Sequence, residues 1–143
     1  MVKVQEILRK KGTHVEGVPP QTPVIDALRL MADKNYGSIA VLDDGRYMGL
    51  VTERDYSRKV ILMGRNSTDT TVAEIMTTDL PGITPLDSID RCMELMSHKH
   101  IRYLPVFDHG NLAGIISMTD VVSAKMMRQQ ETISQLESYI SGG

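Results

Sequence analysis

Two copies of one pattern lie 65 residues apart in this chain of 143 residues. The first copy covers 39–55 and ends in GLVTERD; the second covers 104–120 and ends in GIISMTD. The same offset pairs Pro20 with Pro85 and Val41 with Val106. Internal repetition constrains the architecture more strongly than any single motif does. We therefore expect two similar halves and two equivalent places where a ligand could bind.

Each half is predicted to run strand–helix–strand–strand–helix, which makes the chain an α/β protein. In the second half we expect a strand around Ile83 ending at Pro85, a helix capped by Asp87, strands at 103–107 and 112–116 around a turn at 108–111, and a helix from Ser117. Glycine and asparagine tolerate positive φ, so Gly110 and Asn111 are expected to form that turn.

The first half repeats this order. We expect a helix with Thr22 as capping residue and Pro23 as first residue, strands at 39–42 and 47–51 around a turn at 43–46, and a helix from Thr52. A polar linker at 64–71 and a helical turn at 72–76 follow. The predicted domains are a first repeat with linker at 1–68, a second repeat at 69–126 and a helical extension at 127–143.

Composition excludes several classes of function. A net charge of −2 gives no basic face for nucleic acid or anionic lipid, so nucleic-acid binding is not expected. No apolar run approaches the ~20 residues that cross a bilayer. The single cysteine, Cys92, excludes an internal disulfide and is typical of a reducing compartment. We expect a cytoplasmic protein without a membrane span.

The last segment carries apolar or neutral residues at alternating three- and four-residue steps: Met126, Gln129, Ile133, Leu136 and Ile140. This pattern predicts a helix with one apolar stripe. It lasts only about two heptads, short of the ~3–4 that identify a coiled coil. We expect the helix to pack against its own chain, with a self-associating zipper as the alternative.

The repeated motif has two physical explanations. Thr52 and Ser117 suit helix N-caps, and Asp55 and Asp120 at the third helical position would complete capping boxes. The same atoms could bind a nucleoside phosphate, because a helix N-terminus attracts phosphate and a carboxylate accepts hydrogen bonds from a ribose diol. One copy alone favours capping, whereas two copies in register favour ligand binding.

Both halves resemble CBS (cystathionine β-synthase) domains, and the whole chain resembles a stand-alone pair of them, a Bateman module. The resemblance rests on IRYLPV at 101–106 with the second motif, and on SIAV at 38–41 with the first. It covers about Val4 to Met126. It implies two repeats packed through their sheets about a pseudo-twofold axis, and commonly a homodimer.

The resemblance also implies a function: a regulatory module without catalysis of its own that binds an adenine nucleotide such as AMP, ADP, ATP or NAD(H), or S-adenosylmethionine. Asp55 and Asp120 would bind ribose, and Thr52 and Ser117 phosphate. Residues near the base would be Val18, Pro20, Ile83 and Pro85. The remaining implied site residues are Ile39, Arg54, Arg102, Tyr103, Leu104, Pro105 and Thr119.

The two repeats differ at the implied sites. Arg54 places a cation inside the first motif, where the second has Thr119, and Arg102 stands where the first repeat has Gly37. We therefore expect unlike clefts with unequal occupancy. Arg54, Arg58 and Lys59 form either a solvated helix face or a phosphate contact.

Other chemistry finds little support in the sequence. His98 and His100 are two residues apart and would point to different sides of a helix, which argues against a metal site. Cys92 corresponds to Ala27 on the buried face of its helix and is predicted to be a packed thiol. No catalytic grouping is evident. The rival function is a ligand-free interaction module that regulates a partner enzyme or transporter.

Overall fold

The computed structural model describes residues 1–12 and 14–141, and the chain divides into two compact units. The first unit contains the helices α1, α5 and α6, the strand β4 and most of β5. The second unit contains β1, β2 and β3 with α2, α3, η1 and α4. The helix that opens the chain, α1, thus belongs to the same unit as the second hairpin. The two compact units therefore do not coincide with the first and second halves of the sequence.

The second unit is built on a three-stranded sheet in the order β1-β2-β3. Its strands are β1 (Gly17–Val18), β2 (Ser38–Asp43) and β3 (Arg46–Thr52), with β1 parallel and β3 antiparallel to β2. Its helical segments are α2 (Val24–Lys34), α3 (Glu53–Tyr56), the π-helical turn η1 (Ser57–Ile61) and α4 (Val72–Ile75). The core contains Val18, Val24, Ala27, Met31, Ile39, Val41, Val51, Val60, Val72 and Ile75.

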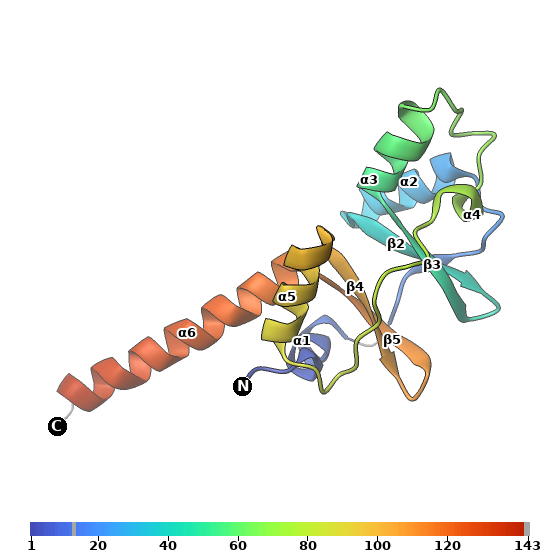
Figure 1. The fold of residues 1–143 in the computed structure, drawn as a ribbon. Helices are drawn as coiled ribbons and strands as arrows, with labels where there is room; N and C mark the ends of the chain where they lie inside the picture. Colours follow the sequence, from blue (N-terminus) through green and yellow to red (C-terminus); the bar gives the residue numbers. More distant parts are fainter. Residues whose placement is uncertain (13, 142–143) are drawn as a thin grey trace. The chain divides into compact units, whose positions relative to one another are not determined.

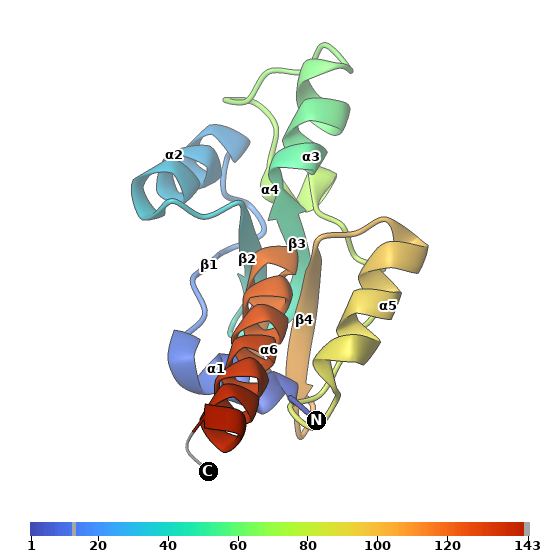
Figure 2. The ribbon, with the colours of Figure 1, turned by 90° about the vertical axis from the view of Figure 1, so that its left-hand side faces the viewer.

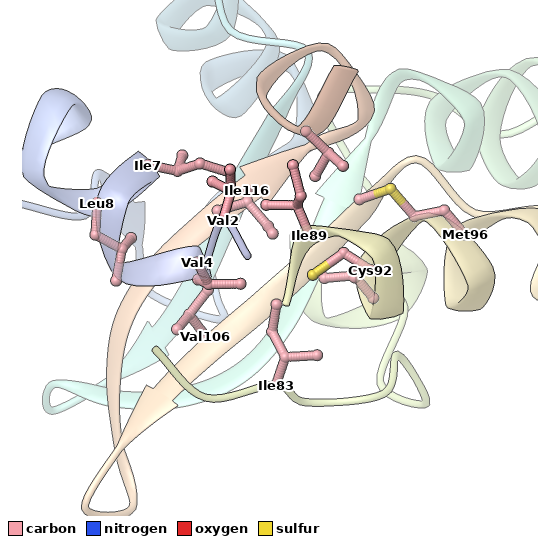
Figure 3. Packing of buried hydrophobic residues seen from close by; sticks show 12 residues of the cluster. Val2, Val4, Ile7, Leu8, Ile83, Ile89, Cys92, Met96, Val106 and Ile116 are labelled. Carbon is pink, nitrogen blue, oxygen red and sulfur yellow. The ribbon is translucent and has the colours of Figure 1, made fainter. Parts of the chain in front are cut away.

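The first unit is built on the antiparallel hairpin of β4 (Tyr103–Asp108) and β5 (Asn111–Ser117). Ile83 makes one parallel bridge to Val106, so the short strand predicted to end at Pro85 is reduced to a single paired residue. The helices are α1 (Val4–Lys11), α5 (Ile89–Lys99) and α6 (Met118–Ser141). Figure 3 shows apolar side chains from α1 and α5 converging with those of the hairpin. Each unit therefore has the predicted strand–helix–strand–strand–helix order, and the α/β fold is confirmed.

Two helices begin differently from the sequence prediction. Pro23 is itself the N-cap of α2, in an extended conformation, and Thr22 makes no capping bond there. Ser88, not Asp87, caps α5 and accepts a hydrogen bond from the Arg91 amide. Asp87 instead accepts from the Thr84 amide and closes the preceding turn. Asp, Ser and Thr are all good caps, so a run of such residues does not fix the first residue of a helix.

The β4–β5 turn has a different pair of positive φ values from the pair expected. His109 (φ 52°) and Gly110 (φ 82°) take the positive φ values, and Asn111 begins β5. Asp44 (φ 52°) and Gly45 (φ 80°) do the same in the first hairpin. Two positive φ values fit a two-residue hairpin turn whose twist matches the strands. The predicted turn at 108–111 is therefore confirmed, with Asp108 and Asn111 as its ends; of the two residues expected to suit a positive φ, Gly110 adopts one and Asn111 does not.

The helix α6 is one continuous element of 24 residues. Its first part contacts α1 and α5, and its last part extends beyond both of them (Figure 1). Figure 2 looks along this helix from its C-terminal end. Ile133, Leu136 and Ile140 are 47%, 56% and 80% exposed. The prediction that this stripe packs against its own chain was therefore wrong. The part of α6 that carries these residues extends beyond the core of its unit.

Candidate functional site

The first motif forms a capping box at the junction of β3 and α3. Oγ1 of Thr52 accepts from the Asp55 amide at 3.1 Å, and Oδ2 of Asp55 accepts from the Thr52 amide at 2.9 Å. The Thr52 hydroxyl also donates to the same Oδ2 at 3.0 Å. The capping interpretation of the motif is thus confirmed for this copy. Capping alone leaves the other carboxylate oxygen, Oδ1, available.

In this unit Oδ1 of Asp55 is already occupied. It accepts from the Thr77 hydroxyl at 2.7 Å and from Nζ of Lys59 at 2.9 Å. Lys59 also donates to the Ile75 carbonyl. The Asp55 side chain is only 6% exposed. A buried carboxylate must be paired and hydrogen-bonded, and these donors satisfy that requirement. Asp55 is therefore saturated by its own chain.

The second motif forms the same box at the junction of β5 and α6. The Ser117 hydroxyl accepts from the Asp120 amide at 3.1 Å, and Oδ2 of Asp120 accepts from the Ser117 amide at 2.8 Å. The partner that follows is different. Nζ of Lys11, the last residue of α1, donates to the same Oδ2 at 2.8 Å and to the Ile115 carbonyl at 2.9 Å.

The second aspartate is therefore more open than the first. Its side chain is 23% exposed, against 6% for Asp55. Within the described part of the chain, Oδ1 of Asp120 accepts no hydrogen bond. One further acceptor is thus available at Asp120, as a ribose diol would require. The two repeats therefore offer unlike aspartates.

A cavity of about 440 Å³ lies beside Asp120, between α1 and α6. The position that Lys59 occupies in the first repeat corresponds to Ala124 in the second, and Ala124 lines this cavity. The short side chain leaves room where the first repeat has a long one. Four basic and three acidic side chains line the cavity with apolar ones: Val2, Glu6, Ile7, Arg9, Lys10, Lys11, Asp120, Ser123, Ala124, Met127, Arg128 and Glu131. Its size suits a small ligand.

Several predicted site residues lie in hydrophobic cores. Val18 and Ile39 belong to the core of the second unit, and Ile83 and Leu104 to that of the first. Pro105 is also buried, and Tyr103, Pro20 and Pro85 are half-buried. Arg54, Arg102 and Thr119 are exposed. Of all the predicted residues, Asp120 is the one that lines the cavity between α1 and α6.

Two important partners were missed in the sequence. Thr77 lies just after α4 and reaches Asp55, and Lys11 ends α1 and reaches Asp120. The offset of 65 places Thr77 opposite Gly12, so the partner of each aspartate comes from neighbouring positions of the two repeats. The correspondence of Thr77 with Gly12 was the one signal in the sequence for these two partners. It could identify them only together with the tertiary structure, which shows that the residues after α4 and at the end of α1 lie beside the two aspartates.

Other chemically active groups give no further site. Among the described residues, no three His, Cys, Asp or Glu side chains gather as metal ligands. Cys92 is fully buried, and this burial raises the pKa of its thiol to about 11, so it is a packed thiol as predicted. None of the described helices combines the length and apolar character needed to span a membrane.

Comparison with known proteins gives a consistent result. The family model for the CBS domain matches residues 4–61 and 72–127. A mitochondrial CBS domain-containing protein of Arabidopsis thaliana, CBSX3, is 34% identical over 149 residues, which cover 98% of this chain and 72% of that protein. The CBS domain-containing protein YhcV of Bacillus subtilis is 33% identical and covers 82% of this chain and 83% of its own.

Solved structures agree with these relatives. A protein with CBS domains from Burkholderia ambifaria matches with a TM-score of 0.85 and 41% identity, over 90% of this chain and 96% of its own. A hexameric CBS-CP12 protein from bloom-forming cyanobacteria matches with a TM-score of 0.74 and 29% identity, over 85% of this chain and 66% of its own.

Proposed function

Because the chain belongs to the CBS-domain family and contains a pair of CBS domains, we propose that it is a non-catalytic regulatory module that binds an adenine nucleotide at Asp120. The ligand is AMP, ADP, ATP or NAD(H). The observation that carries this proposal is an open carboxylate oxygen beside a cavity with a cationic lining. A nucleotide needs an acceptor for its ribose hydroxyls and cations for its phosphates.

The ribose contact follows from the geometry of the second capping box. Oδ2 of Asp120 is held by the Ser117 amide, which fixes the carboxylate in one orientation. Oδ1 then accepts from the ribose hydroxyls without disturbing the cap. A preorganised acceptor binds more tightly than a mobile one, because less side-chain entropy is lost on binding.

The phosphate contact involves the basic side chains of α1. Lys10 and Lys11 line the cavity with Arg128, and Lys11 already lies beside Asp120. A bound phosphate competes with the Asp120 carboxylate for the Lys11 ammonium group. Hydrogen bonds between a cation and phosphate are about twice as strong as neutral ones. The apolar side chains of the same cavity, such as Ile7 and Met127, provide a surface for the base.

The first aspartate is expected to bind poorly by the same argument. A ligand at Asp55 must displace the Thr77 hydroxyl or the Lys59 ammonium group from a buried carboxylate. Removing one partner from a buried pair is costly. Occupancy of the two repeats is therefore unequal, and Asp120 is the primary site.

Signalling follows from the position of Lys11. It ends α1, so a ligand that moves this side chain acts on the contact between α1 and α6. The ligand shifts a conformational equilibrium only by its difference in affinity for the two states. At 100 times its dissociation constant it stabilises the binding state by about 2.7 kcal/mol. The proposed assembly contains two copies of this chain and the partner protein that it regulates.

The test is isothermal titration of nucleotide-stripped protein with AMP, ATP, NAD and NADH. We expect one ligand to bind the wild type, Asp120→Asn to weaken that binding at least about tenfold, and Asp55→Asn to leave it nearly unchanged. Glu131→Gln is the matched control, because it removes a carboxylate from the same cavity without touching the cap. Normal binding in Asp120→Asn together with loss in Asp55→Asn would place the ligand at the first repeat.

The second candidate is a ligand-free module that regulates a partner enzyme or transporter. The saturated Asp55 favours it, because a capped and fully paired aspartate needs no ligand. Absence of binding for every nucleotide in the titration would support this function instead.

The cytoplasmic location stays a prediction, and the Arabidopsis relative is described as mitochondrial.

A further inference from the structure

The two motif aspartates differ in the residue that follows each of them by four positions. After Asp55 this residue is Lys59, in η1, and after Asp120 it is Ala124, in α6. Nζ of Lys59 lies 2.9 Å from Oδ1 of Asp55. Resting on the nucleotide site proposed at Asp120, we propose that Lys59 closes the first repeat to nucleotide and that Ala124 keeps the second repeat open. Lys59 is then the residue that determines which repeat binds.

The lysines of the two repeats contact different carboxylate oxygens. Nζ of Lys11 donates to Oδ2 of Asp120, which is the oxygen that already accepts the Ser117 amide. Nζ of Lys59 lies instead against Oδ1 of Asp55. In both repeats the capping box uses Oδ2 and leaves Oδ1 as the acceptor for a ligand. Lys11 therefore leaves the ribose acceptor open, whereas Lys59 covers it.

The donors on Asp55 take the place of those that a ligand would supply. The Thr77 hydroxyl donates to Oδ1 at 2.7 Å, and the Lys59 ammonium group adds a second donor. A ribose diol likewise presents two hydroxyl donors to one carboxylate. Each oxygen of an ionised carboxylate has about two lone-pair sites, so these two donors fill Oδ1. Removal of the ammonium group frees one site, because the Thr77 hydroxyl uses only the other.

The helices α1 and α4 explain why the two lysines come from different places. The helix α1 has eight residues and ends at Lys11, whereas α4 has four and ends at Ile75. The shorter helix has no second turn that could carry a lysine to Asp55. Lys59 fills this role from η1, and its Nζ also donates to the Ile75 carbonyl at 2.9 Å. Two oxygens thus hold Lys59 over the carboxylate, although its side chain is 43% exposed.

Position 124 is the counterpart of position 59 in the second repeat. Ala124 belongs to the lining of the cavity beside Asp120. Residues four apart lie on one face of a helix, so Ala124→Lys would bring an ammonium group to the Asp120 carboxylate. The residues at 59 and 124 can therefore be exchanged between the repeats, with opposite effects on binding.

The first experiment opens the first repeat. Isothermal titration with AMP compares Asp120→Asn, in which the second repeat is impaired, with Asp120→Asn combined with Lys59→Ala. We expect Lys59→Ala to raise the affinity for AMP at least about tenfold in this background, and to add a second bound nucleotide per chain when Asp120 is intact. Lys59→Arg is the matched control, because it keeps a cation at this position and should leave the first repeat closed. Circular dichroism checks that each variant is folded.

The second experiment closes the second repeat. Ala124→Lys should weaken AMP binding at least about tenfold, because the new ammonium group occupies Oδ1 of Asp120. Ala124→Met has a similar length without the charge and should keep most of the affinity. Val122→Lys adds the same charge two residues away, outside the cavity lining, and should leave the affinity unchanged.

The outcomes distinguish this inference from the proposed function. Binding by the wild type without a gain in Lys59→Ala overturns the role of Lys59 and leaves the proposed function intact. A gain in Lys59→Ala without binding by the wild type supports that role and removes the site at Asp120. Absence of binding in the wild type and in every variant overturns both.

Loss of its lysine leaves the buried Asp55 without a cation, which is destabilising. If Lys59→Ala does not fold for this reason, the second experiment decides. Undiminished affinity in Ala124→Lys, or an equal loss in Ala124→Met, then overturns the inference.

Discussion

Nζ of Lys11 lies 2.8 Å from Oδ2 of Asp120, so one ion pair joins the last residue of α1 to the first turn of α6. The corresponding carboxylate of the first repeat, Asp55, is paired instead with Lys59, one helical turn further along the same segment. The pairing with Lys59 is local, whereas the pairing with Lys11 spans its unit. A ligand at Asp120 must therefore affect α1, whereas Asp55 has no such connection through its lysine.

Replacement of Lys11 by methionine separates the two roles of this lysine. If Lys11 moves to the phosphate on binding, Lys11→Met should weaken AMP binding about tenfold while affinity for neutral adenosine stays level or rises, because a charge-assisted bond is lost only with AMP. Titration of wild type and Lys11→Met with AMP and with adenosine measures the change in affinity for each ligand. Arg9→Met is the control, since Arg9 lines the same cavity but does not contact Asp120. Equal losses for AMP and adenosine would contradict the phosphate role.

Asparagine at position 55 should destabilise the protein more than asparagine at position 120. An asparagine has one carbonyl oxygen in place of two acceptors, so Thr52, Lys59 and Thr77 lose part of their pairing in a buried site. We expect Asp55→Asn to lower the free energy of unfolding by about 1–3 kcal/mol. The exposed pair at Asp120 contributes at most about 1 kcal/mol. Urea unfolding measures the loss in the free energy of unfolding for each variant. Equal losses in Asp55→Asn and Asp120→Asn would contradict the prediction.

Alanine at the two equivalent glycines should also have unequal effects. A Cβ at Gly49 would lie 2.9 Å from the carbonyl oxygen of Thr77, which accepts the Leu50 amide and cannot withdraw without breaking that bond. A Cβ at Gly114 would meet Cδ2 of Leu8, the end of a side chain that can rotate. Gly49→Ala should cost about 1–3 kcal/mol and Gly114→Ala less. Thermal unfolding of the two variants tests the order, which a larger loss in Gly114→Ala would reverse.

Acid should weaken the capping box at the start of α4. Hydrogen bonds from the Thr71 amide, followed by that from Arg65, lower the pKa of Glu74 below its ordinary value of 4.5. A lowered pKa in the folded state means that the stabilisation is complete above the unfolded pKa and is lost as pH falls through the folded one. Glu74→Gln keeps a capping side chain without this titration. The stability difference between wild type and Glu74→Gln should therefore change in acid and stay constant above about pH 6.

The local features of this protein were predictable from its sequence. The repeat and the order of strands and helices follow from the residue pattern along the chain, and the capping of α3 and α6 follows from contacts between residues three apart. Such contacts are encoded by nearby residue types, so Thr52 with Asp55 and Ser117 with Asp120 could be paired from their spacing alone. The same reasoning misplaced the caps of α2 and α5, because neighbouring residues compete for one role.

The tertiary structure decided which partners the two aspartates have. Thr77 is 22 residues from Asp55 and Lys11 is 109 residues from Asp120, separations at which residue spacing carries no geometric information. Only the packing of α1 beside α6 brings Lys11 to the carboxylate. The periodicity of the α6 sequence likewise determined which of its side chains share one face. Whether that face is buried depended on the tertiary structure, because a helix face is covered only where another element packs on it. The last part of α6 extends beyond the core, so its apolar face is exposed.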